Sequence, residues 1–191
     1  CTVEDPIEMV SPEFNQMQVH NAIDLDFAAG VRTLMRQDPD IIMVGEIRDL
    51  ETAQMAVQAS LTGHLVLSTL HTNDAPSALT RLLDLGVPNY LIQSTLTGVV
   101  AQRLVRTLCP HCKSETTLDV RAWAALTHHW QLPVPGKSYG PKGCLECRKT
   151  GFLGRTGIYE MMRISPPLRA LIQPSMDLAK VGEVALSEGM Q

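Results

Sequence analysis

Short apolar runs alternate with amphipathic stretches along this chain, and this alternation predicts strands separated by helices. Residues 41–44 form a continuous apolar run, and residues 65–70 form a second, mostly apolar run that contains Ser68 and Thr69. Such runs are typical of strands that are buried on both faces of a parallel sheet. Between them, residues 50–61 place apolar side chains at helical spacing. The segment therefore predicts a strand–helix–strand unit of an α/β fold.

The other periodic segments extend this α/β pattern. We expect the end of a strand at residues 2–8, a short strand at residues 17–20, and a helix at residues 27–36 that is capped by Asp24 or Asp26. Residues 99–106 fit either a strand or a helix, and their β-branched content favours the strand. The further expected elements are helices at residues 75–85, 90–97, 166–172 and 176–187, and a glycine turn followed by a strand within residues 151–164.

Polar side chains follow the two apolar runs at the point where each run ends. Glu46 comes directly after the first run and Gly45, and His71 follows the second run. The carboxyl ends of parallel strands meet at one edge of a sheet, where ligands bind in open α/β folds. An acid at this edge is typical of nucleotide hydrolases, which use it to hold Mg²⁺ or to orient a water molecule. The alternative is an ordinary helix start at Glu46 and a structural histidine at His71.

Two further groups of charged residues have both a functional and a structural interpretation. Glu4, Asp5 and Glu8 surround a proline, and their carboxylates are suitable ligands for Mg²⁺, although an ordinary acidic loop has the same composition. Arg32 and Arg36 are four residues apart and are expected to project from one side of a helix. They form either a solvated basic face or a contact to phosphate or to another subunit.

Four of the five cysteines form two C-x-x-C pairs, Cys109 with Cys112 and Cys144 with Cys147. Paired thiolates of this kind suit a tetrahedral Zn²⁺ ion. Because cysteine fills all four positions, no position is left for water, and we expect a structural site. A redox or disulfide function is the alternative, and His111 is a less suitable alternative ligand.

Composition narrows the possible classes of protein. With 45% hydrophobic residues, the chain of 191 residues can bury a sizeable core. The net charge of −4 argues against nonspecific binding of nucleic acid, which requires an excess of lysine and arginine. No apolar run approaches the ~20 residues of a membrane-spanning helix. The chain opens on Cys1 without an initiating methionine, so we expect an internal segment of a longer protein. The clustered cysteines, as metal ligands, indicate a reducing compartment.

Several of these motifs occur together and in order, and together they resemble a known family. They are Val-Glu-Asp-Pro-Ile-Glu at residues 3–8, Arg-Gln-Asp-Pro-Asp-Ile-Ile-Met-Val-Gly-Glu-Ile-Arg-Asp at residues 36–49, Leu-Thr-Gly-His-Leu-Val-Leu-Ser-Thr-Leu-His-Thr-Asn at residues 61–73, the two cysteine pairs, and Gly-Phe-Leu-Gly-Arg-Thr-Gly at residues 151–157. The set closely resembles the type II secretion and type IV pilus assembly ATPases, which are motors of the secretion-ATPase superfamily. The four cysteines favour an assembly or secretion motor over a retraction ATPase.

The resemblance implies a fold and a division of the chain. The fold class is α/β, a partial RecA-like P-loop ATPase core with a tetracysteine zinc subdomain and a small helical C-terminal part. Residues 1–107 would be the C-terminal half of the ATPase domain, with the aspartate box, the Walker B strand and the histidine box. Residues 108–157 would form the zinc subdomain, and residues 158–191 the small C-terminal subdomain.

The resemblance also implies roles for individual residues. Glu46 would orient or deprotonate the attacking water, and His71 would sense or contact the γ-phosphate of ATP. The carboxylates of the aspartate box would help to hold Mg²⁺ through water; they are Glu4, Asp5 and Glu8. The arginines of a subunit boundary would stabilise nucleotide-bound packing between protomers; they are Arg32, Arg36 and Arg48. Zn²⁺ would be structural, on Cys109, Cys112, Cys144 and Cys147.

By the same resemblance, the full-length protein would be a cytoplasmic homo-hexamer, bound to the inner membrane through protein partners. It would act with an inner-membrane platform protein and with the proteins that recruit it, and not with nucleic acid. The family's phosphate-binding loop precedes the aspartate box, and this chain begins after it, so residues 1–191 alone are expected to be inactive. The alternative from a different class is a zinc-stabilised scaffold without catalysis.

Overall fold

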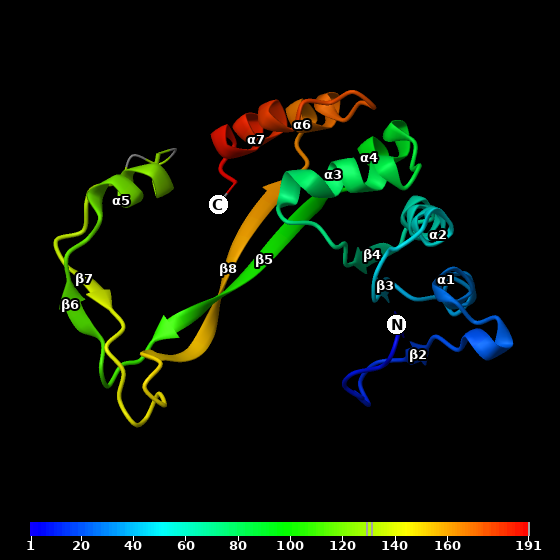
Figure 1. Ribbon diagram of the computed structural model, residues 1–191. Helices are drawn as coiled ribbons and strands as arrows, with labels where there is room; N and C mark the ends of the chain where they lie inside the picture. The colour runs from blue at the N-terminus through cyan, green and yellow to red at the C-terminus, as the bar shows by residue number, and fades with distance from the viewer. Residues whose placement is uncertain (129, 131, 191) are drawn as a thin grey trace. The chain divides into compact units, whose positions relative to one another are not determined.

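The structure is a computed structural model and describes residues 1–128, 130 and 132–190. These residues form two compact units, one of residues 1–101 with 160–191 and the other of residues 102–159 (Figure 1). The C-terminal helices thus belong to the same unit as the N-terminal sheet. The three-part division implied by the resemblance stays a prediction.

A four-stranded parallel sheet lies at the centre of the first unit. Its strands are β1 (Thr2–Glu4), β2 (Gln16–Gln18), β3 (Ile41–Val44) and β4 (Leu65–Ser68), in the order β2-β1-β3-β4. Strands β3 and β4 are in parallel register from Ile41 opposite Leu65 to Val44 opposite Ser68. Helix α2 (Leu50–Leu61) connects them. The predicted strand–helix–strand unit is confirmed, and its two strands end side by side.

The prediction that both strands are buried on both faces is wrong. Ile42 and Val44 are fully buried, but Ile41 and Met43 on the other face of β3 are 47% and 40% exposed. Leu65 and Leu67 of β4 are each 51% exposed. Helices α1 (Phe27–Leu34) and α2 cover one face of the sheet, and no element among the described residues covers the opposite face.

Helix α1 begins as expected but ends earlier. Asp26, and not Asp24, caps it by accepting a hydrogen bond from the Ala29 N–H at 2.7 Å. Asp24 instead adopts a left-handed conformation after a short 3-10 turn, η1 (Asn21–Ile23). Because the helix ends at Leu34, Arg36 lies in the following turn. Arg32 and Arg36 therefore do not share one helical face, contrary to the prediction.

Helix α2 packs between two hydrophobic cores. Ala53 and Ala56 belong to the core that it shares with the helices after β4, and Ala59 belongs to the core between α1 and the sheet. Small side chains allow this close packing on both sides. The helical spacing of apolar residues would also bury Leu61, but its side chain is 57% exposed at the end of the helix.

The rest of the first unit consists mainly of helices around the larger core. They are α3 (Ala75–Asp84), α4 (Asn89–Thr95), α6 (Pro166–Leu171) and α7 (Leu178–Ser187). Strands β5 (Gly98–Leu108) and β8 (Phe152–Arg163) pair with each other, and both pass from the first unit into the second. The strand prediction for residues 99–106 is confirmed.

The second unit also contains a two-stranded antiparallel sheet and one helix. Strands β6 (Ser114–Thr116) and β7 (Ser138–Gly140) form the sheet, and α5 (Val120–Leu126) lies between them in sequence. Across both units, none of the helices that the structure describes has the length and apolar character needed to cross a membrane.

Candidate functional site

The ends of β3 and β4 bring three charged or ionisable side chains together. The Glu46 carboxylate lies between Arg48 and His71, with Oε1 at 2.5 Å from Arg48 Nη2 and Oε2 at 3.1 Å from His71 Nε2. The side chain of Glu46 is only 13% exposed, whereas that of His71 is 83% exposed. The two strand ends therefore place a largely buried carboxylate beside an accessible imidazole. The sequence predicted that the two side chains meet at one edge of the sheet, but not their difference in burial.

Hydrogen bonds between the loop after β3 and the loop after β4 hold Glu46 and His71 in place. The Ile47 N–H donates a hydrogen bond to the Thr69 carbonyl at 3.0 Å, and the Thr69 hydroxyl donates to the Gly45 carbonyl at 2.6 Å. The sequence reasoning did not assign Thr69 a role of its own. Thr69 directly follows β4, just as Gly45 directly follows β3. This equivalent position is the signal that could have identified it.

The electrostatics of the cluster keep Glu46 ionised. The hydrogen bond from Arg48 lowers the pKa of the Glu46 carboxyl, and the contact with His71 acts in the same direction, while burial opposes both. The same hydrogen bond raises the pKa of Arg48 further. A carboxylate of this kind accepts hydrogen bonds well but is a weak base.

The three acids at the end of β1 and just after it do not form a common site. Glu4 ends β1, and its Oε1 accepts hydrogen bonds from the Thr2 hydroxyl at 2.5 Å and from Gln16 Nε2 at 3.1 Å. Asp5 and Glu8 are exposed, and Asp5 contributes to the electrostatic stabilisation of Arg48. Among the described residues, the only group of three or more side chains placed to hold a metal ion is the cysteine group. The three carboxylates are thus not assembled as direct ligands.

A hollow of about 330 Å³ adjoins this region. Asp5 and Arg48 lie on its wall together with the N-terminal ends of α1 and α2. The lining residues are Asp5, Val19, Asn21, Asp26, Phe27, Ala28, Arg48, Asp49, Glu51 and Thr52. Asp49 accepts a hydrogen bond from the Thr52 N–H at 2.8 Å and so caps α2.

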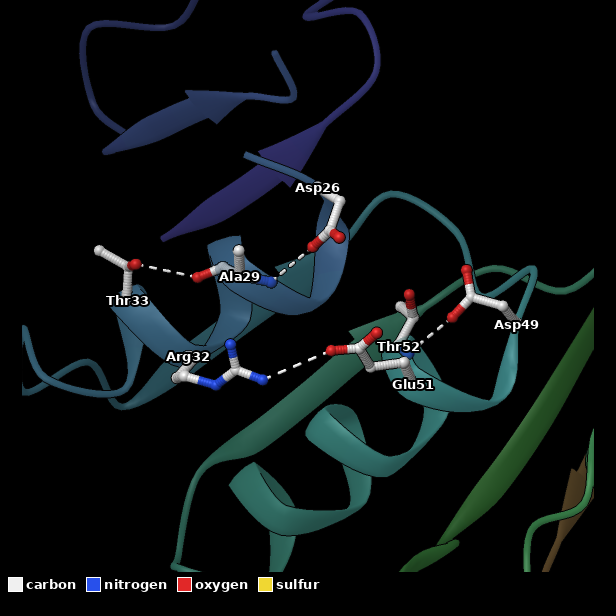
Figure 2. A network of polar contacts seen from close by, with 7 residues as sticks. All are labelled: Asp26, Ala29, Arg32, Thr33, Asp49, Glu51 and Thr52. Carbon is white, nitrogen blue, oxygen red and sulfur yellow. Dashed lines mark hydrogen bonds and ion pairs between the residues drawn. The ribbon is translucent and has the colours of Figure 1, made fainter. Parts of the chain in front are cut away.

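The predicted boundary arginines do not converge. Figure 2 shows Arg32 on α1 extending toward Glu51 on α2, and their Nη2 and Oε1 atoms are 3.5 Å apart. Arg36 is exposed in the turn after α1, and Arg48 pairs with Glu46. Only Arg48 thus lies in the cluster at the strand ends.

The four predicted cysteine ligands come together in the second unit. Their sulfur atoms all lie within 4.8 Å of one another. The Sγ–Sγ distances are 3.9 Å for Cys109–Cys144 and 3.8 Å for both Cys112–Cys147 and Cys144–Cys147. Sulfurs at about 2.3 Å from a central Zn²⁺ ion in a tetrahedron are about 3.8 Å apart. The donor set and its spacing therefore fit Zn²⁺, and no distance approaches that of a disulfide bond.

Backbone N–H groups hold two of these sulfurs. Cys147 Sγ accepts from the Cys144 and Gly151 N–H groups at 3.2 Å each, and Cys112 Sγ accepts from the Gly143 N–H at 3.3 Å. Hydrogen bonding, first from the Cys144 N–H, lowers the pKa of Cys147 to about 6, while burial raises that of Cys112 to about 11. Sequence reasoning missed both glycines, although each stands next to a cysteine pair or shortly after it.

Comparisons with known proteins agree with this fold and show the family to which the chain belongs. The family model described as "Type II/IV secretion system protein" matches residues 1–191. The chain is 60% identical to the type IV pilus assembly ATPase TfpB of Acinetobacter baylyi over 191 residues, covering 100% of this chain and 33% of that relative. It is 50% identical to the type II secretion system ATPase E of Vibrio cholerae over 187 residues, covering 98% and 36%.

Solved structures show the same architecture. The pilus retraction motor PilT with bound ADP matches with a TM-score of 0.63 and 29% identity, and the ATPase DotB of Legionella pneumophila with 0.64 and 26%. Each match covers 100% of this chain and 44% of the solved chain. The chain spans about a third of the length of the curated relatives cited above. With its whole length matched by the family model, the chain belongs to the type II/IV secretion system protein family.

Proposed function

We propose that this chain is part of a motor ATPase whose hydrolysis of ATP powers type II secretion or type IV pilus assembly. The observation that carries the proposal is the Glu46–His71 contact of 3.1 Å at the ends of two adjacent parallel strands. This edge is where α/β nucleotide hydrolases bind and process their substrate. The relatives named as ATPases support the same function.

In this function, Glu46 orients the attacking water. Its lowered pKa makes it a good hydrogen-bond acceptor and a weak base, which favours orientation of the water over its full deprotonation. Since Arg48 and His71 occupy its two oxygens, one of them must move or share an oxygen when water is bound. His71, with its exposed ring, is the group that contacts the γ-phosphate.

The remaining charged residues support the nucleotide from further away. Glu4, Asp5 and Glu8 supply oxygen ligands of the type that Mg²⁺ accepts, through bridging water since they do not converge. Mg²⁺, when bound, neutralises charge on the phosphate oxygens. Arg32, Arg36 and Arg48 contribute to nucleotide-bound packing between protomers of a hexamer.

In our proposal, most of the contacts that bind the phosphates of ATP come from residues outside this chain. A phosphate-binding loop in the longer protein supplies backbone N–H groups and a lysine. Residues 1–191 alone are therefore expected to hydrolyse ATP negligibly. A clear ATPase rate from this chain by itself would contradict that part of the proposal.

The cysteine group binds a structural Zn²⁺ ion in this proposal, since all four ligand positions are occupied by sulfur. The hexamer works in the cytoplasm, at the inner membrane. It passes domain motions to a membrane platform protein and is recruited by cytoplasmic partners.

Substitution of Glu46 tests the proposal in the full-length protein. Glu46→Gln keeps the size of the side chain but removes the charge, and we expect kcat to fall on the order of 100-fold with nucleotide affinity retained. Secretion or pilus assembly should stop in cells that carry this variant. Glu183→Gln, on the exposed face of α7, is the matched control. Full transport activity of the Glu46→Gln variant would instead favour a non-catalytic scaffold.

A further inference from the structure

We propose that Glu160 is a positioning residue that holds the His71 loop in place by capping helix α3. The inference deepens the proposed function and rests on it. The carboxylate of Glu160, on β8, accepts a hydrogen bond from the Ala75 N–H at 2.9 Å, across 85 residues of sequence. Ala75 is the first residue of α3, and only three residues separate it from His71.

The first turn of α3 needs an acceptor that its own sequence does not supply. Of its first three residues, Pro76 has no N–H and the Ser77 N–H is bonded to the Asp74 side chain at 2.8 Å. The Ala75 N–H is left, and Ala75 is 0% exposed, so water does not replace a lost partner there. Glu160 is the group that satisfies this donor.

The loop that carries His71 is fastened at both ends. At its start, Thr69 bonds to Gly45 and Ile47 beside Glu46. Within it, the Thr72 hydroxyl donates to the Asp74 carbonyl at 3.2 Å. At its end, the Glu160 cap fixes the position of α3. Loss of this last contact leaves the end of the loop unfastened. The side chain of His71 is then no longer held in a fixed position.

Glu160 is itself held firmly by its strand. Two residues further along β8, Met162 is 1% exposed in the core that also contains Leu79 of α3. In the opposite direction along the chain, β8 extends back to Phe152 in the second unit. Through this cap, a displacement of β8 would move α3 and with it the loop that carries His71.

The test compares three substitutions in the full-length protein. Glu160→Ala removes the acceptor and is expected to lower kcat roughly tenfold while the KM for ATP changes by less than about twofold. Glu160→Gln keeps an acceptor oxygen at the same distance and is expected to retain most of the activity. Glu160→Asp shortens the side chain, so its carboxylate no longer reaches the Ala75 N–H, and kcat should fall as in Glu160→Ala. This variant keeps the test valid if the alanine variant does not fold.

Amide hydrogen exchange of residues 70–80 provides a readout that does not depend on activity. Exchange should become faster in Glu160→Ala and Glu160→Asp but not in Glu160→Gln or in the control Glu183→Ala on α7. Unchanged exchange and kcat in the alanine variant, or equal impairment of the glutamine variant, would overturn the inference. If the wild-type protein showed no ATPase activity, the proposed function would fail, and the exchange data alone would decide the role of Glu160.

Discussion

At the scale of single residues, the pairing of Glu46 decides what the site can do. Its carboxylate is enclosed on one side by protein and contacts a permanent cation, Arg48, at 2.5 Å. The lowered pKa of Glu46 means that folding favours its ionised form. The interaction with Arg48 that suits Glu46 to the proposed role of orienting water thus also contributes to stability.

This linkage predicts a dependence of stability on pH. Because the pKa of Glu46 in the folded state lies below the usual 4.5, its contribution is complete above that value and is lost as the pH falls through the folded pKa. The difference in thermal stability between the chain and its Glu46→Gln variant should therefore shrink between about pH 6 and pH 3. A difference that stays constant over this range would contradict the ion pairing seen in the structure.

Gly151 is expected to be required for metal affinity. Its N–H donates to Cys147 Sγ, its φ is +79°, and an added Cβ would lie 2.4 Å from the Pro141 Cβ. Gly151→Ala should weaken zinc binding by about 10- to 100-fold, the range typical of lost outer-shell contacts. Competition with a chelator measures this affinity.

Gly154 provides the matched control for this change. It has the same φ of +79°, and an added Cβ would meet nothing within 4 Å. Gly154→Ala therefore carries the same backbone strain without the clash and without a change at sulfur. Equal zinc affinities of the two variants would show that strain alone, and not the contact to Cys147, explains any effect.

At the scale of elements, the sequence predicted the type of most helices and strands of the first unit but not their burial, and it predicted none of β6, α5 and β7 in the second unit. The period of apolar residues locates α2 and α3 to within one residue. Periodicity does not show which face of β3 has a covering element, because an apolar run looks the same in both cases. The end of α1 at Leu34 was also missed, which separated Arg36 from Arg32.

The Arg32–Glu51 contact between α1 and α2 is expected to contribute little to stability. The two side chains are 52% and 65% exposed and 3.5 Å apart, so water and salt screen them. A double-mutant cycle with Arg32→Ala and Glu51→Ala should give a coupling energy of about 0.2–1 kcal/mol that falls with added salt. A larger, salt-independent coupling would show that this pair fixes the packing of the two helices.

At the scale of the whole molecule, the candidate site was predictable because it depends on strand ends, whereas the cap from Glu160 was not. Glu46 and His71 each follow an apolar run, and parallel pairing makes their proximity a consequence of topology. The contact between Glu160 and Ala75 joins positions 85 residues apart and follows no local pattern. Long-range polar contacts of this kind require the tertiary structure.

The exposed face of β3 and β4 predicts self-association of the isolated chain. Register places Ile41 opposite Leu65 and Met43 opposite Leu67, so these four side chains form one continuous apolar surface. Burial of this surface between two copies removes apolar area from water, at about 25 cal/mol per Å². Residues 1–191 should therefore form dimers or larger species in analytical ultracentrifugation.

Replacing Met43 and Leu67 by glutamine should shift the isolated chain toward monomer, since both side chains lie at the centre of this surface and neither contributes to the buried face. Leu61→Gln is the control, because Leu61 is equally apolar and 57% exposed but lies at the end of α2, away from the sheet. A monodisperse monomer of the unmodified chain would contradict the prediction, because the exposed apolar face of β3 and β4 would then not drive association.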